Sequence, residues 1–239
     1  MINPFTAIAY FIKRKIVPGF KIPRHHLVLD VGSGNMPFWR GDVFLDKLKV
    51  GNIHRHKGQQ TIHNIGIFVD ADASKMPFKD KAFDFSFCSH LLEHVKNPTS
   101  VINEIVRVSK RGYIEVPNGV IETIYPFHSH LWLIFYANST LYFFRKSDLM
   151  QKVLQINGLN FIDLLDKTKD PFIKFYWNNK INFKITDNKV EKEFIAEKNS
   201  SKLSNHVEQN QGHVYMTIIS LLRIFFYEKK NIDKIKILK

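Results

Sequence analysis

The stretch "LVLDVGSGNMPFWRGDVFLD" (residues 27–46) decides the fold class. It opens on an apolar, β-branched run around one aspartate, which is typical of a buried strand. The "GSG" turn that follows lets a backbone approach a nucleotide closely, and such a turn normally opens a helix. Pro37 and a second apolar run at residues 42–45 come too soon for a full helix. We therefore predict a strand, a glycine turn, at most one helical turn and a second short strand.

The next seventy residues alternate strand and helix patterns. Residues 65–71, 83–89 and 113–117 are β-branched or aromatic runs of strand length, bounded by turn residues. Between the last two, Asn97 and Pro98 suit a helix start, and apolar residues then follow a helical period to about Ser109, with Gly112 ending the element. The pattern predicts an α/β, Rossmann-like fold whose mostly parallel sheet carries helices on both faces and has a shortened first helix.

Beyond Pro117 the pattern changes. Residues 130–144 predict two strands around an "ANST" turn, and residues 172–185 predict a second hairpin with its tip at Asn178-Asn179. These are the added C-terminal β-hairpins of the predicted fold. A capped helix is expected from Ser147, and polar loops are expected at 49–63 and 187–212. The predicted divisions are a basic N-terminal segment (1–26), a central domain (27–186) and a polar excursion with a basic C-terminal segment (187–239).

Charge is concentrated at the two ends of the chain. The formal net charge is +13 over 239 residues. Residues 1–24 hold five basic residues and no acid, and residues 216–239 hold six basic and two acidic residues. Such segments can lie on an anionic membrane surface, meet an acidic partner, or form the solvated face of a helix packed on the domain. Nucleic-acid binding is unlikely, because no base-reading motif accompanies the charge.

From the cysteine content and the hydropathy of the sequence, we expect the protein to be cytoplasmic. Cys88 is the single cysteine, so neither an intrachain disulfide nor a cysteine-based zinc site can form. The apolar run "TIISLLRIFFY" is too short to span a bilayer, and the N-terminal stretch lacks the basic start of a cleaved signal. We expect a cytoplasmic protein with possible peripheral contact at the inner face of the membrane.

Three segments in order resemble the class I S-adenosylmethionine-dependent methyltransferases, in particular a branch of small bacterial enzymes. They are "VLDVGSG" (28–34), "DASKMPFKDKAFDFSFCSHLLEHV" (72–95) and "NEIVRVSKRGYIEVPN" (103–118). A lone DxGxG is weak, but several pieces in the correct order and spacing are specific. The resemblance identifies the central domain as a methyltransferase domain and continues more loosely to "PFHSHLW" (126–132).

The resemblance implies that S-adenosyl-L-methionine binds where the first strands end. The glycine turn would admit the methionine carboxylate and ribose, and Asp46 would accept the ribose hydroxyls. Asp72 would accept from the adenine amine. The implied cofactor residues are Asp30, Gly32, Ser33, Gly34, Asp46, Asp72, Ala73 and Ser89.

Each of the three acids has a structural alternative. Asp30 could cap a turn, Asp46 could be a surface acid at a strand end, and Asp72 could belong to an ordinary turn. Met36 stands where the family has its third glycine, so the pocket is expected to be reduced.

Methyl transfer to a hydroxyl needs a general base, for which histidine is the usual choice. The candidates are His90, His128 and His130, while Glu93 and His94 in "LLEHV" are expected to be structural. Histidine pairs at 54/56 and 128/130 have metal-ligand spacing, but no acid or cysteine set completes either, so we predict no metal site.

Two functions remain open. The first is transfer of a methyl group to a small-molecule or glycan acceptor, at oxygen. The second is a binding or scaffold protein that has kept the fold without turnover and docks on a membrane surface or an acidic partner. The intact glycine turn and acids favour the first, and the shortened helix leaves the second open.

Overall fold

The computed structural model describes residues 17–34, 36–47, 65–124, 127, 129–146, 172–186, 223, 227, 230, 232 and 234–239. The predicted loop at 49–63, the helix expected from Ser147 and the excursion at 187–212 lie outside these residues. The elements, in chain order, are α2 (Val17–Phe20), β1 (Val28–Val31), β2 (Val43–Asp46), β3 (Ile67–Asp70), β4 (Phe83–Ser89), α3 (Pro98–Val108), β5 (Ser109–Pro117), α4 (Gly119–Ile124), β6 (Trp132–Ala137), β7 (Thr140–Arg145), β8 (Phe172–Asn178), β9 (Phe183–Thr186) and α8 (Lys234–Ile237).

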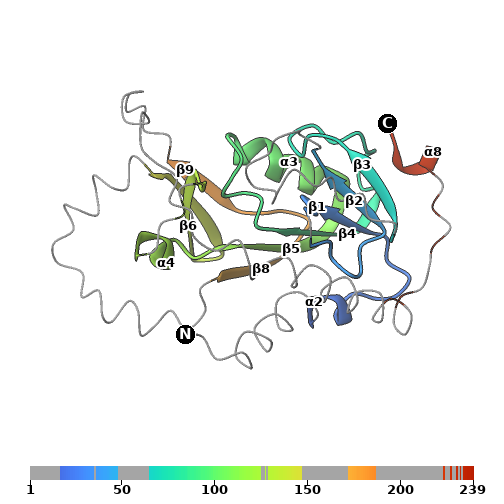
Figure 1. Cartoon of the computed structure of the whole chain (residues 1–239), viewed down its shortest axis with the longest axis horizontal. Helices are drawn as coiled ribbons and strands as arrows, with labels where there is room; N and C mark the ends of the chain where they lie inside the picture. Colours follow the sequence, from blue (N-terminus) through green and yellow to red (C-terminus); the bar gives the residue numbers. More distant parts are fainter. Residues whose placement is uncertain are drawn as a thin grey trace, which may run out of the picture.

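The central element is a six-stranded sheet in the order β3-β2-β1-β4-β5-β8. All neighbours are parallel except β8, which pairs antiparallel with β5 at one edge. Helix α3 lies on one face of the sheet, and α2 lies on the other (Figure 1). This arrangement confirms the predicted Rossmann-like α/β fold. It also gathers the carboxyl ends of the parallel strands, where open α/β sheets bind ligands, at one rim.

A loop takes the place of the missing first helix. Residues 32–34 and 36–42 connect β1 to β2 without helical structure. Phe38 and Trp39 in this loop are buried against the α2 face of the sheet. The Phe38 ring stacks on Phe87 with centroids 3.9 Å apart, and Phe87 stacks on Tyr113 at 5.2 Å. Two aromatic side chains therefore cover a face that a helix would otherwise bury.

Helix α3 forms as its sequence predicts. The Asn97 side chain accepts from the backbone N–H of Ser100 at 3.2 Å, and Pro98 is the first helical residue. The expectation that Gly112 separates this helix from the next strand was wrong, because β5 begins at Ser109 and Gly112 lies inside it. A Cβ at Gly112 would clash with the carbonyl oxygen of Ser86 on β4, so this glycine permits close strand packing.

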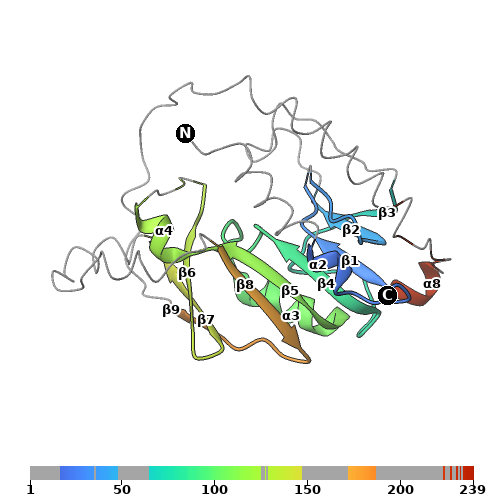
Figure 2. The ribbon, with the colours of Figure 1, turned by 90° about the horizontal axis from the view of Figure 1, so that it is seen from below.

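The second, smaller sheet has the order β6-β7-β9. The hairpin of β6 and β7 is confirmed, and its turn residues Asn138 and Ser139 have φ of 48° and 56°, as a type I′ turn requires. The second predicted hairpin was wrong, since β8 joins the large sheet while β9 pairs parallel with β7. Figure 2 shows β8 beside β5 and β9 beside β7. Burial of alternate β8 side chains along the edge of β5 outweighs the local turn signal.

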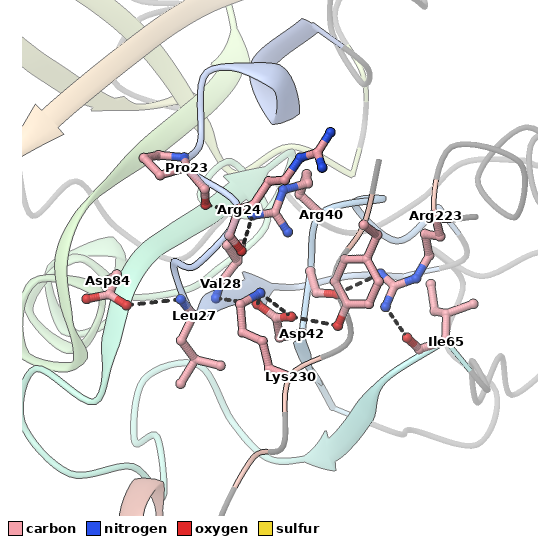
Figure 3. Close-up of polar contacts among 12 residues, drawn as sticks. Pro23, Arg24, Leu27, Val28, Arg40, Asp42, Ile65, Asp84, Arg223 and Lys230 are labelled. Carbon is pink, nitrogen blue, oxygen red and sulfur yellow. Dashed lines mark hydrogen bonds and ion pairs between the residues drawn. The ribbon is translucent and has the colours of Figure 1, made fainter. Parts of the chain in front are cut away.

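The amino-terminal rim of the large sheet is closed by residues from the C-terminal segment. Asp42, fully buried just before β2, accepts from the Val28 N–H at 2.8 Å, the Tyr227 hydroxyl at 2.6 Å and Lys230 Nζ at 2.8 Å. Arg223 stacks on Tyr227, 3.6 Å from the ring centroid. Figure 3 shows this cluster, which we call the Asp42 clasp.

Besides stacking on Tyr227, Arg223 binds three backbone carbonyls at the Asp42 clasp. Its guanidinium donates to the carbonyls of Trp39 and Gly41 at 2.8 Å each, and to that of Ile65. Burial, together with the hydrogen bond to Asp42, raises the pKa of Tyr227 to about 12. The clasp thus joins the chain end to the loop that replaces the first helix. None of the helices in the described part of the chain is long and apolar enough to cross a membrane.

Candidate functional site

The glycine turn after β1 has the backbone that cofactor binding requires. Gly32 and Gly34 have φ of 72° and 53°, which side chains rarely tolerate. The Gly32 N–H donates to the Leu45 carbonyl at 2.8 Å, and the Gly34 N–H donates to Asp46 Oδ2 at 2.8 Å. A Cβ at Gly34 would meet nothing closer than 4.0 Å, so the turn has open space at this residue.

Asp30 and Ser33 stand on either side of Gly32. The Asp30 carboxylate is buried and accepts from the Phe38 N–H at 2.7 Å, which fixes the loop that replaces the helix. The Ser33 hydroxyl is buried and has no hydrogen-bond partner among the described residues. A buried hydroxyl without a partner is costly, so it is suited to bind a ligand atom in the turn.

Asp46 is the last residue of β2, and Asp72 follows the neighbouring strand β3. Asp46 holds the Gly34 and Lys47 N–H groups at 2.8 and 2.7 Å. Asp72 accepts from Lys47 Nζ at 2.6 Å and from the Ser74 N–H and hydroxyl at 2.9 and 2.7 Å. These hydrogen bonds, Lys47 first, lower the pKa of Asp72 to about 2.

The structure therefore brings the glycine turn, Asp46 and Asp72 into one chain of contacts. Ala73 is buried in the core beside Asp72. Lys47 was missed by sequence reasoning, and no motif marks it apart from its place directly after the strand-two acid. The turn, the two carboxylates and the unpartnered Ser33 hydroxyl fit a ligand with amino and hydroxyl donors and an acidic group, as S-adenosylmethionine has.

A second group of polar side chains follows β4 and β5. The Ser89 hydroxyl donates to Glu115 Oε1 at 3.0 Å, so Ser89 is tied to β5. His90 has φ of 56°, and its Nδ1 lies 2.9 Å from Glu93 Oε1 while its Nε2 lies 3.4 Å from Glu115 Oε1. The Tyr113 hydroxyl donates to Glu115 Oε2 at 2.9 Å. Two fully buried carboxylates thus hold one imidazole.

Glu115 was missed by the sequence analysis, although a signal was present. An acid in the apolar strand run "YIEVP" has to be paired if its side chain is buried. Glu93 was expected to be structural; it is fully buried and hydrogen-bonded to His90. The Nδ1 of its neighbour His94 lies 3.1 Å from the Ser129 carbonyl oxygen.

His90 and His130 line the same cavity, which has a volume of about 280 Å³. His130 Nδ1 lies 2.8 Å from Glu122 Oε2, and Lys146 Nζ lies 3.1 Å from Glu122 Oε1. Burial would raise the pKa of Glu122, but the His130 and Phe127 hydrogen bonds outweigh it and lower that pKa. His128 lies outside the described residues. The cavity is lined by His90, Pro117, Asn118, Ile121, Glu122, Phe127, His130 and Phe172.

The arrangement is suited to move a proton at the wall of this cavity. An imidazole whose one nitrogen is held by a carboxylate keeps its orientation, and the carboxylate stabilises the cation formed when the ring takes a proton. His90 has this arrangement at the end of β4, and His130 has it at another point of the same cavity wall. Aromatic and aliphatic side chains supply much of the remaining wall.

Comparisons with known proteins point to one family. A family model described as "Methyltransferase domain" matches residues 46–114. An uncharacterised methyltransferase of Mycobacterium leprae is 32% identical over 114 residues, which are 45% of this chain and 42% of that protein. A sterol 4-C-methyltransferase of Caenorhabditis elegans is 38% identical over 71 residues, which are 28% of this chain and 21% of that protein. The chain spans less than half the length of these relatives.

Two solved structures are similar at lower identity. One is an S-adenosylmethionine-dependent methyltransferase of Thermotoga maritima, described as a possible histamine N-methyltransferase. It has 17% identity and a TM-score of 0.42, covering 61% of this chain and 70% of that one. The other is a putative methyltransferase of Bacillus halodurans with 20% identity and a TM-score of 0.38, covering 62% and 67%. The family match confirms the resemblance drawn from the sequence and, with it, the cofactor assignment.

Proposed function

Because the chain carries a class I S-adenosylmethionine-dependent methyltransferase domain, we propose that it transfers a methyl group to a hydroxyl oxygen of a small-molecule acceptor. The observation that carries this proposal is the cavity at the carboxyl ends of β4 and β5. His90 and His130 line it, and each is held by a buried glutamate. A hydroxyl is the acceptor that most needs such a base.

The cofactor would be held by the residues at the ends of β1, β2 and β3. Asp46 and Asp72 each have acceptor capacity beyond their present hydrogen bonds, because a carboxylate has about four lone-pair sites. When bound, S-adenosylmethionine supplies an activated methyl group on a sulfonium for in-line displacement. The protein has to align the acceptor with it and take up the proton.

We assign the base to His90 and acceptor binding to His130. His90 directly follows β4, the neighbour of the strand that leads into the glycine turn. Glu93 is hydrogen-bonded to Nδ1 and leaves Nε2 to take up the proton, while Glu115 Oε1, 3.4 Å from Nε2, stabilises the cation so formed. His130 lines the same cavity, where its imidazole can hydrogen-bond to an acceptor.

The acceptor class follows from the cavity wall. Phe127, Phe172 and Ile121 offer apolar faces, while Asn118 and the two histidines offer hydrogen bonds. A volume of about 280 Å³ is at the small end of ligand pockets. A phenol or one sugar ring of a glycan matches this combination of ring faces and hydroxyl partners.

The basic ends of the chain support a further part of the proposal, a cytoplasmic enzyme that meets its acceptor at a membrane surface. Of the basic residues near the C-terminus, Arg223 and Lys230 are engaged in the Asp42 clasp. The proposal therefore depends on the remaining lysines and the N-terminal cluster. Co-sedimentation with anionic and with neutral vesicles tests it, and equal partition to both would remove it.

The test begins with calorimetric titration of S-adenosylmethionine and S-adenosylhomocysteine. We expect micromolar binding that is lost in Asp72→Ala and weakened in Asp46→Ala. Formation of S-adenosylhomocysteine with a panel of phenols and sugars then reports turnover for any acceptor. We expect His90→Gln to abolish turnover and keep cofactor affinity. A wild-type protein that binds no cofactor would support the binding or scaffold function instead.

A further inference from the structure

A cluster of metal-ligand side chains lies beside the acceptor cavity. Glu93, His94 and His130 each offer one ligand atom, and these atoms all lie within 4.8 Å of one another. Glu93 and His94 belong to the turn after β4, whereas His130 precedes β6. The fold therefore joins two segments that are distant in sequence, and it supplies the carboxylate that the histidine pairs lack on their own.

The carboxylate of this cluster is incompletely paired. Glu93 is fully buried, and its Oε1 contacts His90 Nδ1 at 2.9 Å. Its Oε2 is also buried and has no hydrogen-bond partner among the described residues. A buried carboxylate oxygen without a partner costs free energy, and a cation bound there would remove that cost.

Both imidazoles have the outer partners of metal-binding histidines. His94 Nδ1 lies 3.1 Å from the Ser129 carbonyl oxygen, and His130 Nδ1 lies 2.8 Å from Glu122 Oε2. In metal sites, the ring nitrogen that does not bind the metal usually donates to such a carbonyl or carboxylate. In each ring, Nε2 is then the nitrogen presented to a metal. The two rings meet edge to face with centroids 4.6 Å apart.

We propose that Glu93, His94 and His130 bind a divalent transition-metal ion, with Zn²⁺ as the best match. Two imidazoles and one carboxylate suit zinc, and three protein ligands leave a fourth position open. Bond lengths of about 2.0–2.1 Å place the ligand atoms of a tetrahedral site about 3.3 Å apart. Side-chain rotations that move the ligand atoms by roughly 1–2 Å would therefore bring all three into contact with the ion. This proposal departs from the prediction of no metal, which lacked the third ligand.

The role of the ion rests on the proposed function, whereas the metal site itself does not. His130 lines the acceptor cavity, so an ion bound to it would lie beside the acceptor. A hydroxyl bound to a divalent ion gives up its proton more readily. The metal would then take over the acceptor-binding role assigned to His130.

The test uses the whole chain after treatment with a chelator. Calorimetric titration with Zn²⁺ and visible absorption with Co²⁺ measure stoichiometry and ligand type without any activity. We expect one ion per chain and a Zn²⁺-induced rise in melting temperature. Glu93→Gln and His130→Ala should weaken binding by about 100-fold or more, and Glu122→Gln by about 10- to 100-fold, because Glu122 orients a ligand.

The matched control is the double variant His54→Asn/His56→Asn, which removes two histidines that the proposed site does not use. It should bind Zn²⁺ as the wild type does. Loss of binding in this control, unchanged binding in Glu93→Gln, or no binding by the wild type would overturn the proposal. Glu93→Gln preserves shape, and circular dichroism verifies its fold. Titration of S-adenosylmethionine into the metal-free protein tests the proposed function separately.

Discussion

The two rims of the parallel sheet both bury charge, but the buried charge has different surroundings at each rim. At the amino-terminal rim, Asp42 accepts one backbone and two side-chain donors. At the carboxyl-terminal rim, Glu93 keeps an unpartnered buried oxygen, and the adjoining His90 lines a cavity. We therefore expect the cavity, and not the burial of charge by itself, to mark the functional site.

The largest expected effect is a loss of stability when the charge at the amino-terminal rim is removed. Asp42→Ala leaves Lys230 and the Tyr227 hydroxyl buried without their acceptor, so we expect a loss of about 3–5 kcal/mol in unfolding free energy. Urea unfolding measures it. The control is Asp80→Ala, which breaks an exposed ion pair with Arg107 and should leave the unfolding free energy close to that of the wild type. Equal losses would show that the clasp is not a structural centre.

The next effect is a loss of turnover, expected when His90 at the carboxyl-terminal rim is replaced. His90→Gln should lower kcat by about 10²- to 10⁴-fold, because it removes the base. Its affinity for S-adenosylmethionine and its melting temperature should stay close to those of the wild type. Once an acceptor is found, steady-state kinetics with S-adenosylhomocysteine as the readout measures this. If His90→Gln kept its kcat, a residue other than His90 would have to be the base.

A smaller effect concerns alkaline stability of the Asp42 clasp. The pKa of Tyr227 is raised from 10 to about 12, so the folded state favours the neutral phenol. The resulting stability is present below pH 10 and is lost as the pH rises through 12, on the order of 2 kcal/mol. Urea unfolding at pH 9 and 11.5 should show a steeper decline in the wild type than in Tyr227→Phe. Parallel declines would contradict the clasp geometry.

The smallest effect lies at the cofactor end of the sheet. Lys47→Met removes the exposed ion pair with Asp72, and we expect less than about 1 kcal/mol of stability to change at pH 7. The pKa of Asp72, now about 2, should rise toward its usual value, as carboxyl NMR titration would show. The pair stabilises the fold above pH 4 and loses this effect as the pH falls through 2. An unchanged pKa would mean that Ser74 alone holds the carboxylate.

Local pattern was sufficient wherever short-range physics decides the structure. The β1 strand, the glycine turn with positive φ, the Asn97 cap and the hairpin at Asn138-Ser139 all follow from neighbouring residues. The shortened crossover was also predicted, since Pro37 and the early second strand leave no room for a helix. That Phe38 and Trp39 cover the sheet face left by the missing helix became apparent only from the structure, which shows Phe38 stacked on Phe87.

Contacts between residues that are distant in the sequence could not be predicted from local patterns. β8 pairs with β5 across many intervening residues, so no turn signal announced the pairing. Glu115, Glu122 and Lys47 acquire their roles from side chains on other elements. The same is true of Asp42, whose donors lie near the far end of the chain.

The sequence by itself determined the fold class, the resemblance to the methyltransferases and, with it, the cofactor, because strand periodicity, glycine turns and ordered motifs are local properties. Only the tertiary structure decided which carboxylate holds which histidine, which side chains line the cavity beside His90 and how the chain end closes the opposite rim. The reason is physical. Buried polar groups are satisfied by whatever the fold brings within hydrogen-bonding distance, and that choice is made among residues remote in sequence.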